Sequence, residues 1–174
     1  MELKRFRLLW DKDEEQRWLN EMCHNGWALE KFFAGLYTFV PCRPGGYIYQ
    51  VDLLPGQGFT PSDPTGYDEF MADMGVDVVQ HWGRWAILRK SAAEGPFEIY
   101  TDLDSQISLY TRIRSMFVFG LGIELCCSAG IWPNLHHGGI FFTLAALLYA
   151  AILVTFVRAI VTCSRKIKNL EETK

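Results

Sequence analysis

The chain has 174 residues, with 17 Lys and Arg against 20 Asp and Glu, and 49% of its residues are hydrophobic. This length allows one ordinary domain and an accessory segment. Phosphate recognition draws on clustered Lys and Arg, and the sequence has no such cluster, so we expect no nucleic-acid partner. The five cysteines are odd in number and lack CxxC spacing, which argues against a disulfide framework.

The first half of the chain predicts an α+β domain at residues 1–96, which we expect to be cytoplasmic. Residues 4–10 read as a strand, and Asp11 with Glu14 has the spacing of a capping box for a helix that ends at Asn25 and Gly26. Aromatic-rich alternating segments then predict two further strands, at residues 27–33 and 36–40. These elements form one β-α-β-β unit.

The same order of elements recurs in the following residues. A strand is expected at 47–53, then a Gly- and Pro-rich loop, a helix that Gly75 ends, and a hairpin with strands at 76–82 and 85–90. Two degenerate β-α-β-β units are therefore predicted. They favour a single antiparallel sheet with both helices on one face, and two packed sheets are the alternative.

Charge falls abruptly after the domain. Residues 115–157 contain one formal charge, Glu124, whereas residues 1–114 carry 12 Lys and Arg and 17 Asp and Glu. A span of hydrocarbon takes roughly 20 apolar residues. We therefore predict a juxtamembrane amphipathic helix at 97–114, a two-helix transmembrane hairpin at 115–161, and a basic cytoplasmic tail at 162–174.

The hairpin is expected to consist of spans at 115–132 and 140–157, joined by a short turn that contains His136 and His137. These two histidines are too few for a zinc site. Basic residues flank the two outer ends of the hairpin, and the positive-inside rule then places both termini in the cytoplasm. A multi-pass protein of the plasma membrane is predicted, with the bilayer as a partner.

Polar and small residues within the first span suggest two kinds of contact. Glu124, with Ser128 one turn away, is a candidate intramembrane polar site, either proton- or ion-linked or a neutral carboxyl bonded to the other helix. Gly122, Cys126 and Gly130 form a small-residue stripe that permits close helix packing. Self-association or a membrane protein partner is the expected consequence.

The domain is rich in aromatic residues, which predict either an interaction surface or an ordinary core. The candidate members of such a surface are Trp18, Trp27, Tyr37, Tyr49, Trp82 and Trp85.

Several strings resemble one family. They are Phe6 to Trp10, Trp18 to Met22, Gly26 to Leu29, Tyr37 to Phe39 and Tyr49 to Asp52. The chain is similar here to an uncharacterised family of Gram-positive bacterial membrane proteins, known as domain of unknown function 2812. The resemblance implies hydrophobic helices after the domain and genes often placed beside PadR-like regulators, hence a regulated envelope or stress module. The family has no known active site.

No P-loop, GxSxG, HExxH or dinucleotide fingerprint is present, and we predict no cofactor. The expected function is that of a non-enzymatic regulatory or adaptor protein with a cytoplasmic interaction domain. The alternative is an oligomeric channel or transporter subunit organised around Glu124.

Overall fold

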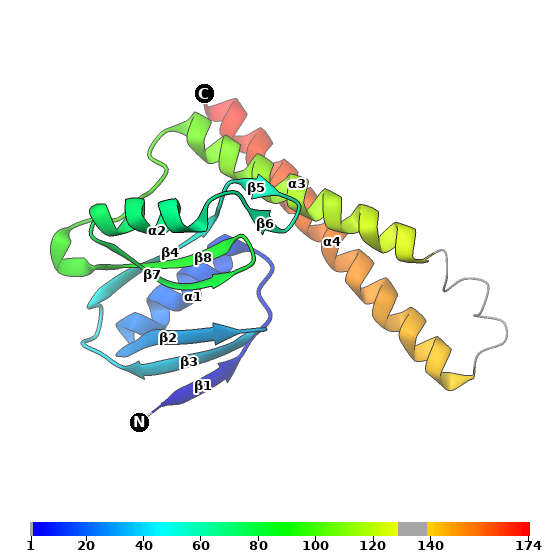
Figure 1. Ribbon diagram of the computed structural model, residues 1–174, viewed down its shortest axis with the longest axis horizontal. Helices are drawn as coiled ribbons and strands as arrows, with labels where there is room; N and C mark the ends of the chain where they lie inside the picture. The colour runs from blue at the N-terminus through cyan, green and yellow to red at the C-terminus, as the bar shows by residue number, and fades with distance from the viewer. Residues whose placement is uncertain (1, 129–138) are drawn as a thin grey trace. The chain divides into compact units, whose positions relative to one another are not determined.

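The computed structural model describes residues 2–128 and 139–174, which belong to two compact units, Met1–Thr101 and Asp102–Lys174. The first unit is α+β and the second consists of two helices (Figure 1). In chain order the elements of the first unit are β1 (Leu3–Phe6), α1 (Lys12–His24), β2 (Trp27–Phe33), β3 (Leu36–Pro41), β4 (Tyr47–Leu53), β5 (Gly56–Gln57), β6 (Thr60–Pro61), α2 (Pro64–Asp73), β7 (Val76–Trp82), β8 (Trp85–Ser91) and a short 3-10 turn (Ala92–Glu94).

The strands form two three-stranded antiparallel sheets, which we call sheet A (β1-β3-β2) and sheet B (β4-β8-β7), and a small β5-β6 pair. The predicted antiparallel α+β character is confirmed. The hydrogen bonding, however, divides the expected single sheet in two. In both sheets the first strand of the unit pairs with the third, so the two units share one strand order.

The division has a visible cause in the two strands that approach each other, β2 and β7. Each contains a register shift, at Leu29/Lys31 in β2 and at Val78/Gln80 in β7. A bulge increases the local twist and interrupts the ladder of backbone hydrogen bonds, so two bulged edge strands do not pair into one continuous sheet. The two bulges occupy equivalent positions in the two units, since each begins three residues after the glycine that ends the preceding helix.

The two helices of this unit lie on opposite faces of sheet B, which corrects the prediction that both lie on one face. Leu19 and Cys23 of α1 are buried against both sheets, in one core with Tyr37 of sheet A and Val51 of sheet B. Met71 of α2 belongs to a second core that contains the alternate residues of sheet B. Because successive strand residues point to opposite faces, sheet B is covered on both sides.

The sequence predicts both ends of α1 and the C-terminal end of α2 correctly, and the structure adds the capping residue of α2. The Asp11 side chain caps α1 by accepting a hydrogen bond from the Asp13 N–H, at 3.0 Å. Asp63 caps α2 in the same way, 2.9 Å from the Gly66 N–H. Asparagine, aspartate, serine and threonine favour this position because they satisfy an unpaired amide of the first turn.

In the second unit, α3 (Leu103–Ser128) runs without a break across residue 114, as the lack of a helix breaker between Asp102 and Gly120 predicts. The helix α4 (Ile140–Thr173) includes most of the tail expected at 162–174. The helices pack antiparallel, through the pairs Asp104 with Lys174, Tyr110 with Lys166, Phe117 with Phe156, and Glu124 with Tyr149.

Within the described residues, one helix is long and apolar enough to cross a membrane, Phe142–Thr173, and none of its most apolar stretch is buried inside protein. The identification of this helix as a candidate span is based on its length and composition. The first predicted span continues past Ser128, so its end, with Gly130, His136 and His137, lies outside the described residues.

Candidate functional site

The side of sheet A that faces away from α1 carries an exposed apolar row. In the register of the sheet, Phe6 of β1 pairs with Leu36 of β3, which also pairs with Phe33 of β2. Directly opposed residues share a face, so the three side chains stand in line across the sheet. Phe6 and Phe33 are each 69% exposed and Leu36 is 41% exposed. We call these residues the apolar row.

The apolar row is extended by neighbours from other segments. The Trp82 ring lies edge-on to the Phe33 ring, with their centroids 5.3 Å apart, and Trp82 is 42% exposed. Leu8 is also exposed and approaches the turn between β2 and β3. Exposed clusters of this kind mark interaction sites more often than single exposed apolar residues do.

The β2–β3 turn fixes this geometry. Gly35 has φ +83°, and a Cβ there would meet the Leu8 Cδ2 atom at 2.9 Å. The Arg7 N–H donates to the Gly35 carbonyl at 2.8 Å, which holds the segment after β1 against the turn. The positive φ of Gly35, with the Arg7 carbonyl 3.1 Å from a Cβ at this position, therefore favours glycine in the turn.

A second row lies directly behind the apolar row on the same face. Lys4 and Lys31 both pair with Thr38, so two ammonium groups flank the central strand. Both lysines are exposed. Lys4 lies 4.0 Å from the exposed carboxylate of Glu2, a pair that solvent weakens. We call Lys4, Thr38 and Lys31 the lysine row.

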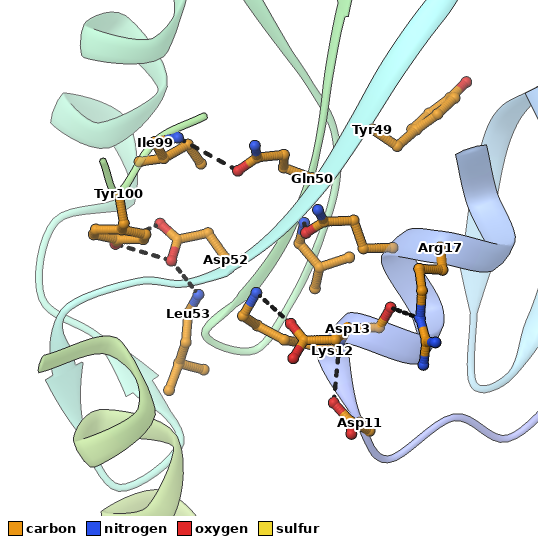
Figure 2. A network of polar contacts seen from close by, with 12 residues as sticks. Asp11, Lys12, Asp13, Arg17, Tyr49, Gln50, Asp52, Leu53, Ile99 and Tyr100 are labelled. Atoms are coloured by element: carbon orange, nitrogen blue, oxygen red, sulfur yellow. Dashed lines mark hydrogen bonds and ion pairs between the residues drawn. The ribbon is translucent and has the colours of Figure 1, made fainter. Parts of the chain in front are cut away.

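In sheet B, the side of β4 that faces α2 contains a buried carboxylate. Asp52 is 1% exposed and accepts hydrogen bonds from the Tyr67 hydroxyl at 2.7 Å and the Tyr100 hydroxyl at 3.0 and 3.1 Å. The Leu53 N–H also donates to it, at 2.7 Å. Figure 2 shows Tyr100 and Leu53 converging on Asp52 from opposite sides. Three donors satisfy a charge that burial would otherwise make costly.

The same face of β4 holds the segment that leads toward α3 in the chain. The Gln50 amide donates to the Phe97 carbonyl and accepts from the Ile99 N–H, the latter at 3.5 Å (Figure 2). Phe97 is buried in the core beneath α2. Together with the Tyr100 contact to Asp52, these bonds fix residues 97–100 on sheet B.

The structure places most of the aromatic residues predicted as an interaction surface inside the domain. Tyr37 and Tyr49 are fully buried core residues, and Trp18, Trp27 and Trp85 pack against the same core. Of the six predicted residues, only Trp82 joins the exposed cluster. The sequence did not point to Phe6, Phe33 or Leu36 as exposed, because their pattern is also that of a half-buried strand.

Buried hydroxyls and thiols in the first core have raised pKa values. Burial, together with the Glu15 carboxylate that accepts its hydrogen bond at 2.7 Å, raises the pKa of Tyr37. Burial also raises the pKa of Glu15. Burial raises the pKa of Tyr49 to about 12, although the hydrogen bond that its hydroxyl oxygen accepts from the Leu29 N–H acts in the opposite direction. The Cys42 thiol has a pKa raised to about 11 by burial and by Cys23, whose Sγ lies 4.0 Å away.

In the helical unit, the predicted polar and small residues of α3 do not form one site. Ser128 donates its hydroxyl to the Leu125 carbonyl at 2.6 Å, within its own helix. The half-buried Glu124 instead lies beside Tyr149, whose hydroxyl donates to the Glu124 backbone carbonyl at 2.9 Å. Gly122 and Cys126 are exposed, on the side of α3 away from α4.

Among the described residues, no group of three or more His, Cys, Asp and Glu is placed to hold a metal ion. A family model described as "Protein of unknown function (DUF2812)" matches residues 11–121. No curated protein matches the chain, and no solved structure matches it.

Proposed function

We propose that this chain, which belongs to the DUF2812 family, is a membrane-anchored, non-enzymatic adaptor or regulatory protein that presents its α+β domain at the cytoplasmic membrane surface. The observation that carries the proposal is α4, whose Phe142–Thr173 segment has the length and apolar character of a span and whose most apolar stretch has no protein covering. An unburied apolar helix of this length finds its lowest free energy in lipid.

The packing of the second unit supports two spans in place of one. Because α3 and α4 are antiparallel, Arg112 and Arg114 of α3 lie at the same end of the pair as Arg158 and Arg165 of α4. The apolar ends of both helices lie at the other end. One basic end is what the positive-inside rule expects of a hairpin with both termini in the cytoplasm.

A topology experiment tests this part of the proposal. Alkaline phosphatase fused after Gly139 should be active, whereas a fusion after Lys174 should be inactive, and the full chain should stay in the pellet after alkaline carbonate extraction. Release by carbonate would show that α4 is not a span. Activity of the fusion after Lys174, with extraction unchanged, would show that the C-terminus is outside and the two-span arrangement is incorrect.

The adaptor role is supported by the exposed apolar row beside Trp82, since a surface of this kind is suited to binding rather than to bond-making chemistry. The test is purification of the full chain in mild detergent after crosslinking in native membranes, with light scattering of the product. A defined partner or a homo-oligomer would support an adaptor. A free monomer that turns over a metabolite would refute it.

A channel organised around Glu124 is the second candidate. The observation that favours it is a carboxyl-bearing residue, half-buried, in the otherwise uncharged part of α3 and beside Tyr149. Reconstituted Glu124→Gln protein separates the two functions. Loss of ion flux with the oligomer intact would favour the channel, and flux that is absent from the parent protein as well would exclude it.

A further inference from the structure

Charge is segregated within the α+β domain. Residues 1–101 carry 10 Lys and Arg against 15 Asp and Glu, a net charge of −5. Residues 3–10 and 27–41, which form sheet A and the segment after β1, carry four Lys and Arg against Glu30, a net charge of +3. An acidic domain therefore has one basic sheet, and that sheet bears the apolar row.

We infer that this outer face of sheet A, through its apolar row and lysine row, binds an anionic lipid bilayer. This inference rests on the proposed membrane anchoring and names the partner of the domain's exposed surface. Two observations select lipid as the occupant: the order of apolar and cationic residues on the face, and the sign of the charge on the rest of the domain.

The two rows match the depth profile of a membrane interface. Residues two apart on one face of a strand are separated by about 7 Å, so the lysine row stands that far behind the apolar row. Amphipathic surfaces enter the boundary between headgroups and acyl chains by roughly 5–10 Å. When Phe6 and Phe33 reach the acyl boundary, Lys4 and Lys31 are at the level of the lipid phosphates.

The exposed aromatic residues suit the same environment. Tryptophan is enriched at the membrane interface, where one side of the ring is apolar and the indole N–H remains wet. Trp82 lies against Phe33, at the turn end of the β7–β8 hairpin. It therefore adds an interfacial residue to the end of sheet A that would enter the bilayer first.

The acidic remainder of the domain sets the orientation. Anionic lipid attracts Lys and Arg near its surface by about fivefold in binding for each residue, and it repels Asp and Glu. The domain has a net charge of −5, whereas the outer face of sheet A presents Lys4 and Lys31, so this face is the favourable side. Arg5 and Arg7 do not add to it, because Arg5 pairs with the core residue Tyr37 and Arg7 forms an ion pair with Glu14 of α1. A tether to a membrane helix keeps the effective lipid concentration high, so a weak contact suffices.

The test is hydrogen exchange of the full chain in nanodiscs made of phosphatidylcholine alone or of phosphatidylcholine with phosphatidylglycerol. Peptides that cover residues 33–36 should exchange several-fold more slowly in the anionic discs, and high salt should abolish the difference, since it screens the lysines. Tryptophan fluorescence gives a second readout. Lipids with brominated acyl chains should quench part of the emission of the parent protein, and the quenched part should be absent from the Trp82→Phe variant.

Matched variants assign the effect to the two rows. Lys31→Glu and Phe33→Ser should each abolish the protection, whereas Arg43→Glu in the β3–β4 loop and Phe70→Ser on α2, which change equally exposed residues elsewhere, should preserve it. Phe70 is 58% exposed and Phe33 is 69% exposed, so the pair is well matched.

Equal exchange in the two lipid compositions would overturn the inference. Protection that rises with protein concentration in detergent, without anionic lipid, would also overturn it and would identify the face as a contact between copies. Carbonate extraction distinguishes the levels of failure, because a chain that extracts as an integral protein but shows no lipid-dependent protection refutes only this inference.

Discussion

Tyr100 donates its hydroxyl to the buried carboxylate of Asp52, 48 residues earlier in the chain, at 3.0 and 3.1 Å. This contact holds the segment after the 3-10 turn on sheet B, at the point where the α+β unit ends at Thr101. Because Tyr67 donates to the same carboxylate, one buried charge joins α2, β4 and the final segment of the domain.

Removing either part of this contact should destabilise the domain. Tyr100→Phe is expected to lower the free energy of unfolding by about 1–3 kcal/mol, because a hydrogen bond to a charged, buried acceptor is lost. Asp52→Ala should cost more, since it leaves the Tyr67 and Tyr100 hydroxyls without their acceptor. Urea unfolding measures both. Tyr67→Phe and Tyr100→Phe should combine non-additively, and strict additivity would show that the two hydroxyls are not energetically coupled through Asp52.

Arg84, in the β7–β8 turn, ties the loop after β4 to the hairpin. Its Nε donates to the Leu54 carbonyl at 2.9 Å and its Nη1 to the Gly58 carbonyl at 3.1 Å, although the residue is 3% exposed. Arg84→Ala should lower the free energy of unfolding by about 2–4 kcal/mol, because one buried and one half-buried carbonyl lose a charged donor. The exposed Arg43→Ala is the control, with an expected change within about 0.5 kcal/mol. Similar effects of the two variants would contradict the structural role of Arg84.

The pH dependence of stability should include a contribution from Glu15. Burial raises its pKa above the ordinary value of 4.5, so the folded state holds the proton more tightly than the unfolded state. The resulting stabilisation is fully present below pH 4.5 and is lost as pH rises through the folded-state pKa. Glu15→Gln should flatten this decline and still accept the Tyr37 hydrogen bond. Unfolding curves between acidic and neutral pH check this, and an unchanged slope would refute it.

The Cys42 thiol should react slowly with iodoacetamide in the folded domain at pH 8. Burial raises its pKa to about 11, so the nucleophilic thiolate is scarce at that pH. Its alkylation rate, followed by mass spectrometry of the peptide, should rise with pH toward the raised pKa and should increase sharply in urea. Cys42→Ser identifies the peptide. Rapid alkylation at pH 8 under native conditions would show that the thiol is not protected.

Most individual elements of this protein can be predicted from short stretches of its amino-acid sequence. Local signals placed both helices and most strands of the α+β domain, because caps such as Asp11, a helix-ending residue such as Gly75 and alternating aromatic residues act over a few residues. The strand expected at residues 4–10 ends at Phe6, and the short β5–β6 pair had no such signal. The apolar character of α4 was equally local, since a long run of apolar side chains is visible in the sequence before any packing is known.

The way these elements combine depends on packing between distant segments. The bulges in β2 and β7 keep two sheets apart, and α1 and α2 lie on opposite faces of sheet B. The position of Asp52 on an alternating strand left open which face would be buried. Its two tyrosine partners come from distant segments, and so do the residues of the apolar row. Side-chain periodicity specifies which residues share a face, but a contact between segments far apart in the chain depends on packing that no local pattern encodes.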